Sequence, residues 1–238
     1  MIAHLPMYDT PENRAAHGRL WDGFYAALGL DGMPSRPGAN LWADWRSPNL
    51  LLSQTCGLPY RAELHRQVQL VATPDNHLPG CPPGHYRSAI IARVGSDPDL
   101  AANDFTLAYN EPLSQSGWGA PWAEGITGAQ RIQTGGHAIS AEAVRASRAD
   151  VAAIDALTWH FLQRDWDGAD QLRVIRWTQP TPTLPYITSV DHDVLPIRDA
   201  LAHAIAGLSD ADQNQLHLYG LVDILADVYL SHPIPPAP

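Results

Sequence analysis

Short apolar runs alternate along the chain with longer stretches in which apolar residues recur at helical spacing. The clearest helical stretch is residues 11–29, which carries Ala15, Leu20, Phe24, Ala27 and Leu28 and ends at Gly29. Further helices are expected at residues 42–45, 55 to about 65, 141–147, 157–164, 194–207 and 210–230. Another helix is expected to begin at about residue 116. Strands are expected at residues 2–7, 50–54, 68–72, 86–94, 104–109, 151–154, 172–178 and 186–190. This alternation predicts an α/β protein with mixed, mostly parallel sheets covered by helices.

The order of these elements predicts two lobes. Residues 87–178 contain the strands and helices of a complete lobe, and residues 1–86 together with 179–238 form a second, discontinuous one. Strand crossings near 86–94 and 172–180 would connect the lobes. The prolines at 233, 235 and 236 predict an extended, poorly ordered end.

The composition is that of a globular protein, with 45% hydrophobic and 17% charged residues. The formal net charge of −10 argues against binding to nucleic acid or to an anionic membrane, because both require clustered Lys and Arg. It does not oppose a small anionic ligand, since backbone N–H groups and hydroxyls hold anions in buried sites. Cys56 and Cys81 lack the CxxC spacing of a structural zinc site, so no metal or cofactor is expected. Whether they form a disulfide stays open.

No run of residues reaches the roughly 18 consecutive apolar positions of a membrane span, so membrane insertion is not expected. The first residues also lack the basic segment and long apolar stretch of a secretory signal. We therefore expect a cytoplasmic location for the chain as given, and a periplasmic one if a signal was removed.

The most informative segment for function is residues 107–121, where an apolar strand ends in a polar loop and a helix opens at Ser114, Gln115 and Ser116. The free N–H groups of a helix's first turn attract anions, and adjacent hydroxyls add donors. Gly117 allows a ligand to approach the backbone. The alternative is a plain helix cap, since Ser is common at that position.

His137 and Asp155 follow two further strands. His137 lies in a Gly-rich turn, Thr134-Gly-Gly-His, where it could donate to an anion or be an ordinary surface histidine. Asp155 precedes a helix, which it could cap, or it could accept a hydrogen bond from a ligand that carries an amine or a proton.

Thr55 and Tyr8 stand at the ends of strands in the other lobe. Thr55 is a candidate helix N-cap that could donate its hydroxyl and its backbone N–H to a ligand. Tyr8 could line the ligand site or only terminate a strand. Cys56 is better interpreted as a half-buried structural thiol than as a nucleophile, since no Cys–His–Asn signature accompanies it. All these candidates lie where open α/β sheets place ligands, at the carboxyl ends of strands.

Taken together in order and spacing, these segments resemble the substrate-binding proteins of phosphate, phosphite and phosphonate ABC importers. The resemblance spans about residues 2–190 and rests on Tyr8, Gln54-Thr-Cys-Gly, Tyr86-Arg-Ser, Ala108-Tyr-Asn-Glu-Pro, Ser114-Gln-Ser-Gly, Thr134-Gly-Gly-His with Ser140 and Val144, and Arg148-Ala-Asp-Val-Ala-Ala-Ile-Asp155. It implies a two-lobed type II periplasmic-binding-protein fold with a ligand cleft between the lobes. It also implies that a permease is a partner.

For the site, the resemblance implies that Ser114, Gln115 and Ser116 hold the oxygens of a phosphonate- or phosphate-like anion. Tyr8, Thr55, His137 and Asp155 would surround it, with no catalytic residue. Binding of the anion would favour a closed state of the two lobes.

Two other functions remain open. A cytoplasmic enzyme on the same fold, similar to menaquinone-pathway enzymes or pyrimidine-precursor synthases, would use His137 or Asp155 as acid or base. No paired carboxylates or metal-ligand cluster supports it. A ligand-sensing partner of a regulatory protein is the third possibility and would need an exposed apolar patch.

Overall fold

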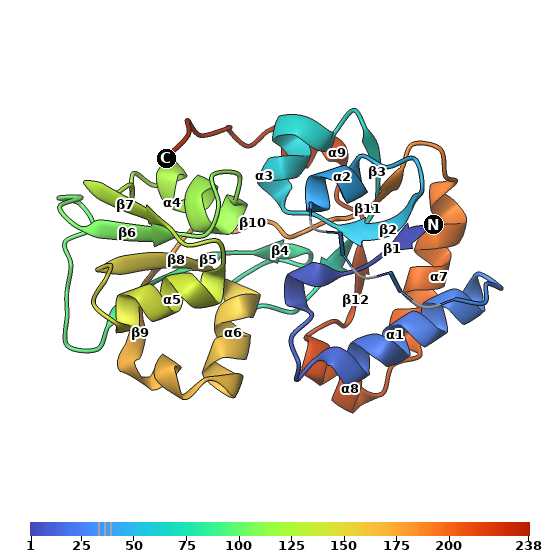
Figure 1. Cartoon of the computed structure of the whole chain (residues 1–238), viewed down its shortest axis with the longest axis horizontal. Coiled ribbons are helices and arrows are strands. Elements are labelled where there is room, and N and C mark those ends of the chain that lie inside the picture. The colour runs from blue at the N-terminus through green and yellow to red at the C-terminus, as the bar shows by residue number, and fades with distance from the viewer. Residues whose placement is uncertain (33, 36, 39) are drawn as a thin grey trace. The chain divides into compact units, whose positions relative to one another are not determined.

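The computed structural model describes residues 1–32, 34–35, 37–38 and 40–238. The chain divides into two compact units, each with its own sheet and core (Figure 1). Unit 1 comprises Met1–His77 and Pro182–Ser231, and unit 2 comprises Leu78–Thr181 and His232–Pro238. The lobe boundaries expected from the sequence, 86/87 and 178/179, differ from these by nine and three residues, and the last seven residues belong to unit 2 rather than to the first lobe.

Unit 1 is built on a five-stranded sheet in which β1 and β2 are parallel, while β11 and β12 run antiparallel to their neighbours. In spatial order its strands are β1 (Ile2–Ala3), β2 (Leu50–Gln54), β11 (Tyr186–Ser189), β3 (Val68–Asp75) and β12 (Gly220–Val222). Its helices are the 3-10 helix η1 (Pro6–Tyr8), α1 (Arg14–Ala27), α2 (Leu41–Trp45), α3 (Gly57–Pro59), which continues as the π-helix η2 (Tyr60–Leu64), α7 (Val194–Ala206), α8 (Asp210–Leu216) and α9 (Ala226–Leu230).

The sheet of unit 1 has a buried cluster on each face. One cluster packs α1 and α7 against the sheet through side chains such as Phe24 and Leu201. The other includes Trp45, Leu64 and Tyr229. Every residue of β2 is buried, which explains why the strand opens with three consecutive leucines instead of alternating apolar and polar residues.

Unit 2 has a second five-stranded sheet in which β6 is parallel to β7 and β8, and β5 is antiparallel to β8 and β9. In spatial order its strands are β7 (Gln130–Gln133), β6 (Thr106–Tyr109), β8 (Val151–Asp155), β5 (Ser88–Arg93) and β9 (Leu172–Trp177). Its helices are the π-helix η3 (Gln115–Gly119), α4 (Ala120–Ala123), α5 (His137–Arg145), α6 (Ala156–Asp165) and the 3-10 helix η4 (Asp167–Gln171). A separate two-stranded sheet pairs β4 (His85–Tyr86) with β10 (Thr181–Pro182).

Small side chains let the helices of unit 2 approach its sheet closely. Ala141 and Ala143 of α5 are fully buried against Ala108 and Ala152 of the central strands. The other face of the sheet is covered by η3 and α4, with Trp118 fully buried beside Leu107 and other apolar side chains. This packing fixes the helices that begin at the candidate anion site.

The structure corrects several sequence expectations. Both sheets are mixed rather than mostly parallel, because β5 and β11 run against their neighbours. The strand expected at 2–7 ends at Ala3, and Pro6, which has no N–H to donate to a ladder, begins a 3-10 helix instead. The expected helical stretch 210–230 is interrupted by β12, and the strand expected at 86–94 is split into β4 and β5.

The C-terminal residues are anchored, contrary to the poorly ordered end that the sequence predicted. Residues 232–238 form neither helix nor strand, but the indole Nε1 of Trp118 donates to the carbonyl of Pro236 over 2.8 Å, and Pro235 is buried. A buried indole N–H requires an acceptor, and the tail supplies it.

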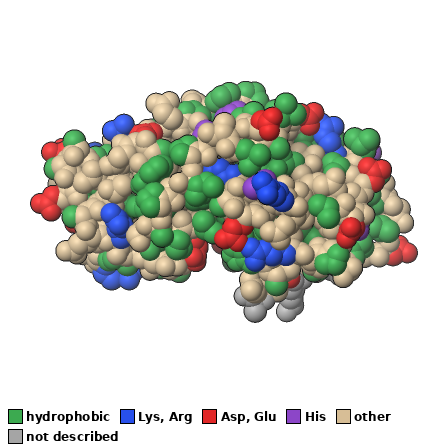
Figure 2. Space-filling view, turned by 90° about the horizontal axis from the view of Figure 1, so that it is seen from above, with side chains coloured by type: hydrophobic (Ala, Val, Ile, Leu, Met, Phe, Trp, Pro, Cys, Tyr) green, Lys and Arg blue, Asp and Glu red, His purple; other side chains and the backbone are tan. Residues whose placement is uncertain are grey.

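The surface carries interspersed charges. Figure 2 shows Arg side chains lying among Asp and Glu side chains on the face in view. Ion pairs such as Arg198–Asp223 join opposite charges. Cys56 and Cys81 are not joined by a disulfide. Among the helices of the described residues, none combines the length and the apolar character needed to cross a bilayer.

Candidate functional site

Three helices of unit 2 begin at one edge of its sheet. Because β6 is parallel to β7 and β8, the carboxyl ends of all three strands lie at the same edge, and they lead into η3, α5 and α6. Ser88, the first residue of the antiparallel β5, pairs with Asp155 and therefore lies at this edge too. The fold thus gathers Ser114, Gln115, Ser116, His137 and Asp155 within one unit, as the strand-end argument predicted.

Ser114 is the N-cap of η3. Its hydroxyl accepts a hydrogen bond from the N–H of Gly117 at 3.0 Å, and its carbonyl accepts from Gly119 at 2.9 Å. The cap considered as an alternative is therefore present. Ser116 follows in the first helical turn, where no helical carbonyl is available to its N–H. The segment from Ser114 to Ser116 is buried, with Ser116 only 3% exposed.

Gly117 is required by a close contact with Asn110. A Cβ atom at position 117 would lie 1.9 Å from Oδ1 of Asn110 and 3.2 Å from the hydroxyl of Ser114. The glycine therefore makes room for a side chain of the preceding loop, in addition to any ligand. Oδ1 of Asn110 is buried and has no hydrogen-bond partner among the described residues. Asn110 was overlooked as a candidate, although its position one residue after β6 was a signal.

His137 is the first residue of α5, whereas the sequence placed it in the bend before a helix starting at 141. Its Nε2 lies 2.9 Å from the hydroxyl of Ser116. Burial lowers the pKa of His137 below the 6.5 of a free imidazole, and the charge of Asp155 and the backbone of Ala153 oppose this shift. The imidazole is therefore neutral at neutral pH, with one nitrogen as donor and the other as acceptor.

The turn before α5 is fixed by Thr134. Its hydroxyl lies 2.6 Å from the hydroxyl of Ser140 and 3.1 Å from the carbonyl of Tyr109. In the same turn the N–H of Gly135 donates to the carbonyl of Asn110. These bonds tie the loop after β7 to the loop after β6 and so position His137 against Ser116.

Asp155 caps α6. One carboxylate oxygen accepts from the N–H of Leu157 at 2.7 Å and of Thr158 at 3.0 Å, and the residue is 2% exposed. This is the structural alternative weighed from the sequence, and its charge acts on His137 as well. Ser88, which ends the Tyr86-Arg-Ser segment but was not among the candidate site residues, donates its hydroxyl to the carbonyl of Ser116 at 2.9 Å.

Thr55 and Tyr8 belong to unit 1, so their place in a shared site stays a prediction. The helix after β2 is capped at Cys56 and not at Thr55. The N–H of Thr55 donates to the carbonyl of Pro185 at 3.1 Å, which corrects the expectation that it is free for a ligand. The hydroxyl of Thr55 is fully buried and has no partner in the described part of the chain. Tyr8 ends η1 rather than a strand, and its carbonyl accepts from Asn13.

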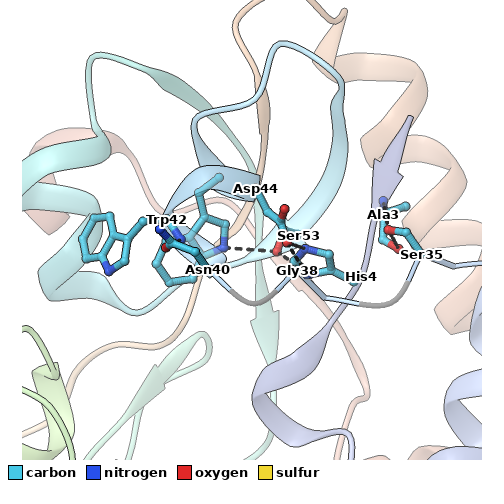
Figure 3. A network of polar contacts seen from close by, with 9 residues as sticks. Ala3, His4, Ser35, Gly38, Asn40, Trp42, Asp44 and Ser53 are labelled. Atoms are coloured by element: carbon cyan, nitrogen blue, oxygen red, sulfur yellow. Dashed lines mark hydrogen bonds and ion pairs between the residues drawn. The ribbon is translucent and has the colours of Figure 1, made fainter.

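A second polar network lies in unit 1 (Figure 3). His4 joins Asp44 through Nε2 at 3.1 Å and Ser53 through Nδ1 at 3.2 Å, while the indole of Trp45 donates to Ser53. A Ser–His–Asp set can serve nucleophilic catalysis. Here Ser53 is fully buried within β2 and cannot reach a substrate, so the network instead holds α2 against β1 and β2.

Within residues 1–32, 34–35, 37–38 and 40–238, no three His, Cys, Asp or Glu side chains are grouped so that they could hold a metal ion. The candidate donors and acceptors at the edge of unit 2 are hydroxyls, amides, the buried imidazole of His137 and the carboxylate of Asp155.

A family model described as "ABC transporter, phosphonate, periplasmic substrate-binding protein" matches residues 52–224. The chain belongs to this phosphonate-binding family. The matched range includes Thr55 and all the unit 2 candidates, while Tyr8 lies outside it. The family resemblance inferred from the sequence is confirmed.

Solved structures of phosphonate-binding proteins share the fold. A binding protein component of a phosphonate ABC transporter from Pseudomonas aeruginosa is 16% identical with a TM-score of 0.72, covering 97% of this chain and 83% of that one. PhnD1 from Prochlorococcus marinus, in complex with methylphosphonate, is 12% identical with a TM-score of 0.73, covering 97% and 94%.

A protein of Xanthomonas citri bound to chloride is 14% identical with a TM-score of 0.68, covering 92% of this chain and 90% of that one. These likenesses confirm the expected type II periplasmic-binding-protein fold. Comparison with curated proteins gives no match.

Proposed function

We propose that this member of the phosphonate-binding family captures a small anion carrying a phosphonate- or phosphate-like group and delivers it to the permease of an ABC importer. The observation that carries the proposal is the buried turn from Ser114 to Ser116, with His137 bonded to Ser116 at 2.9 Å. Membership in a family of periplasmic substrate-binding proteins supports the same function.

The donors of this turn suit a tetrahedral oxyanion. A phosphonate presents several oxygens, each able to accept more than one hydrogen bond, and a helix's first turn offers N–H groups that point away from the helix. The hydroxyl of Ser116 and the amide of Gln115 add side-chain donors. Since these groups are neutral, selectivity would come from the number and direction of hydrogen bonds rather than from net charge, which is −10 for the whole chain.

Thr55 and Tyr8 are the residues of unit 1 that we propose to contact the ligand. The buried hydroxyl of Thr55 supports this role, because a buried donor without a partner costs about 1–3 kcal/mol unless something satisfies it. The contribution of Asp155 is then indirect, through its charge on His137 and its cap on α6.

The enzymatic alternative is not retained. The carboxylate of Asp155 already accepts two backbone N–H groups, and the family is one of binding proteins. The same family membership favours the periplasm over the cytoplasm as the place of ligand capture. Separation of periplasmic and cytoplasmic fractions of the source cell, followed by immunodetection, tests this location.

The function is tested by calorimetric titration of the protein with methylphosphonate, phosphite, phosphate and sulfate, with glutamate as an unrelated anion. We expect saturable one-site binding of at least one phosphorus oxyanion and no turnover. Ser116→Ala should weaken that binding by roughly 10-fold or more, the loss of a hydrogen bond to a charged group.

The matched control is Ser96→Ala, because the Ser96 hydroxyl donates to the carbonyl of Arg93 in a turn outside the site. It should bind as the wild type does. Absence of measurable binding to every phosphorus oxyanion in the panel would contradict the proposal.

A further inference from the structure

The C-terminal tail returns to unit 2 and contacts η3, the helix of the candidate anion-binding turn. Unit 1 ends at Ser231, just after α9, and residues 232–238 belong to unit 2. Prolines at 233, 235, 236 and 238 restrict this segment to extended conformations, so docking it costs less conformational entropy than docking an ordinary chain end.

The tail contacts the buried indole of Trp118. Nε1 of Trp118 donates to the carbonyl of Pro236 at 2.8 Å, and Pro235 beside it is buried. Trp118 is 1% exposed, and the guanidinium of Arg131 lies over its ring at 5.3 Å from the centroid. The indole is thus held by the tail at its N–H and by β7 at its ring.

Trp118 belongs to the helix that carries the candidate donors. It follows Ser116 by two residues in η3, and its own N–H donates to the carbonyl of Ser114 at 3.1 Å. η3 is a single π-helical turn, which has few internal hydrogen bonds to hold its shape. Contacts from outside the helix therefore determine how rigidly the turn from Ser114 to Ser116 is held.

From these contacts we infer that residues 232–238 act as a strap that positions η3 for anion binding, through the hydrogen bond from Trp118 to Pro236. The inference rests on the proposed function of η3 as the anion-holding turn. A docked strap prearranges the donors before the ligand arrives, which raises affinity by reducing the ordering required on binding. Trp118 is a positioning residue here, since it acts on the ligand only through η3.

The test uses two shortened chains and one substitution. A chain ending at Pro233 lacks Pro235 and the acceptor carbonyl of Pro236, whereas a matched control ending at Ala237 keeps both. Trp118→Phe keeps an aromatic ring in the core but removes the donor, and Trp122→Phe in α4 is its control. Hydrogen exchange of the backbone amides is measured without ligand, and Kd for methylphosphonate is measured by calorimetry.

We expect the chain ending at Pro233 and the Trp118→Phe variant to speed exchange at residues 115–119 by several-fold, and to raise Kd by roughly 3- to 10-fold. Exchange at α5 and α6 should stay at wild-type rates, and both controls should match the wild type.

Unchanged exchange at residues 115–119 would overturn the inference that the tail positions η3. Equal acceleration of exchange throughout unit 2 would also overturn it, because that result indicates general destabilisation. Because exchange is measured without ligand, it tests the strap even if methylphosphonate does not bind. Failure of the wild type to bind would instead count against the proposed function.

Discussion

The hydroxyl oxygen of Ser116 lies 2.9 Å from Nε2 of His137, so the first turn of η3 is bonded to the first residue of α5. The two residues follow different strands, β6 and β7, which are parallel neighbours in the sheet. This contact couples the protonation of an imidazole to the direction of a candidate anion donor. When His137 is protonated, Nε2 donates to Ser116 and leaves the serine hydroxyl free to donate to a ligand.

Anion affinity should therefore depend on the protonation of His137. Burial holds the pKa of the unliganded His137 below 6.5, and a bound anion raises it, so binding takes up a proton. We expect the wild type to gain affinity for methylphosphonate relative to His137→Asn as pH falls below 6.5. The protonation of methylphosphonate itself changes with pH, but it affects both proteins equally. The ratio of their Kd values, measured by calorimetry at each pH, therefore reports the effect of His137. His203→Asn, on the exposed side of α7, is the control and should follow the wild type.

The stability of the protein should fall in acid for a related reason. Burial lowers the pKa of both His17 and His137 in the folded chain, while their unfolded value is near 6.5. Unfolding then takes up protons below that pH. The contribution of these two histidines to the free energy of unfolding is therefore fully present above pH 6.5 and decreases as the pH falls below it. Urea denaturation across this range measures the effect.

The double variant His17→Asn, His137→Asn should lose part of this acid sensitivity. A pH profile identical to that of the wild type would show that neither buried histidine contributes.

Replacing Gly117 should damage the candidate site directly. In Gly117→Ala the new methyl group would lie 1.9 Å from Oδ1 of Asn110, so the loop after β6 or the first turn of η3 must move. We expect affinity for methylphosphonate to fall by 10-fold or more, about 1.4 kcal/mol. Gly18→Ala is the contrasting variant: a Cβ there meets nothing within 4 Å, and in α1 it should stabilise by roughly 0.5–1 kcal/mol. Wild-type affinity in Gly117→Ala would contradict this description of the turn.

Thr55→Val separates a structural from a ligand-binding role for the buried hydroxyl. Valine keeps the shape of threonine and removes an oxygen that has no partner in the described residues, so unliganded stability should be unchanged or higher. If the hydroxyl donates to the ligand, as we propose, Kd should rise by roughly 3- to 10-fold. Increased stability with unchanged Kd would remove Thr55 from the site.

The network around His4 should matter for stability and not for binding. Asp44→Ala removes the acceptor of the His4 imidazole, which is 2% exposed, and of the N–H of Gly38. We expect a loss of about 1–3 kcal/mol in the free energy of unfolding, measured with urea, and an unchanged Kd for methylphosphonate. Asp22→Ala, on the exposed side of α1, should change neither quantity. A large effect of Asp44→Ala on Kd would assign this network to ligand binding.

The sequence predicted most of the elements because the pattern of each one matches its environment. Residues 50–52 are three consecutive leucines because β2 is buried along its whole length, and α1 shows helical spacing because one side packs on the sheet. The candidate residues of unit 2 lie together for a topological reason: parallel strands bring the residues that follow them to one edge.

Predictions from the sequence were wrong or incomplete where contacts between distant residues determine the structure. Nothing local distinguishes Ser88 from other serines, yet its hydroxyl holds the carbonyl of Ser116 across 28 residues. The proline-rich end reads as a disordered tail, and only the position of Trp118 gives Pro236 a donor. Likewise, the N–H of Thr55 was expected to be free because its acceptor, the carbonyl of Pro185, is distant in sequence.

The most direct test of the anion-binding turn is a ¹H–¹⁵N NMR titration of the wild type with methylphosphonate, following the backbone amides of Gln115 and Ser116. If this turn holds the anion, these two amides should shift downfield and saturate with the same Kd as calorimetry gives, while the amide of Ser96 stays in place. Saturable binding that leaves both amides unmoved would show that the anion is held elsewhere and would contradict the central claim.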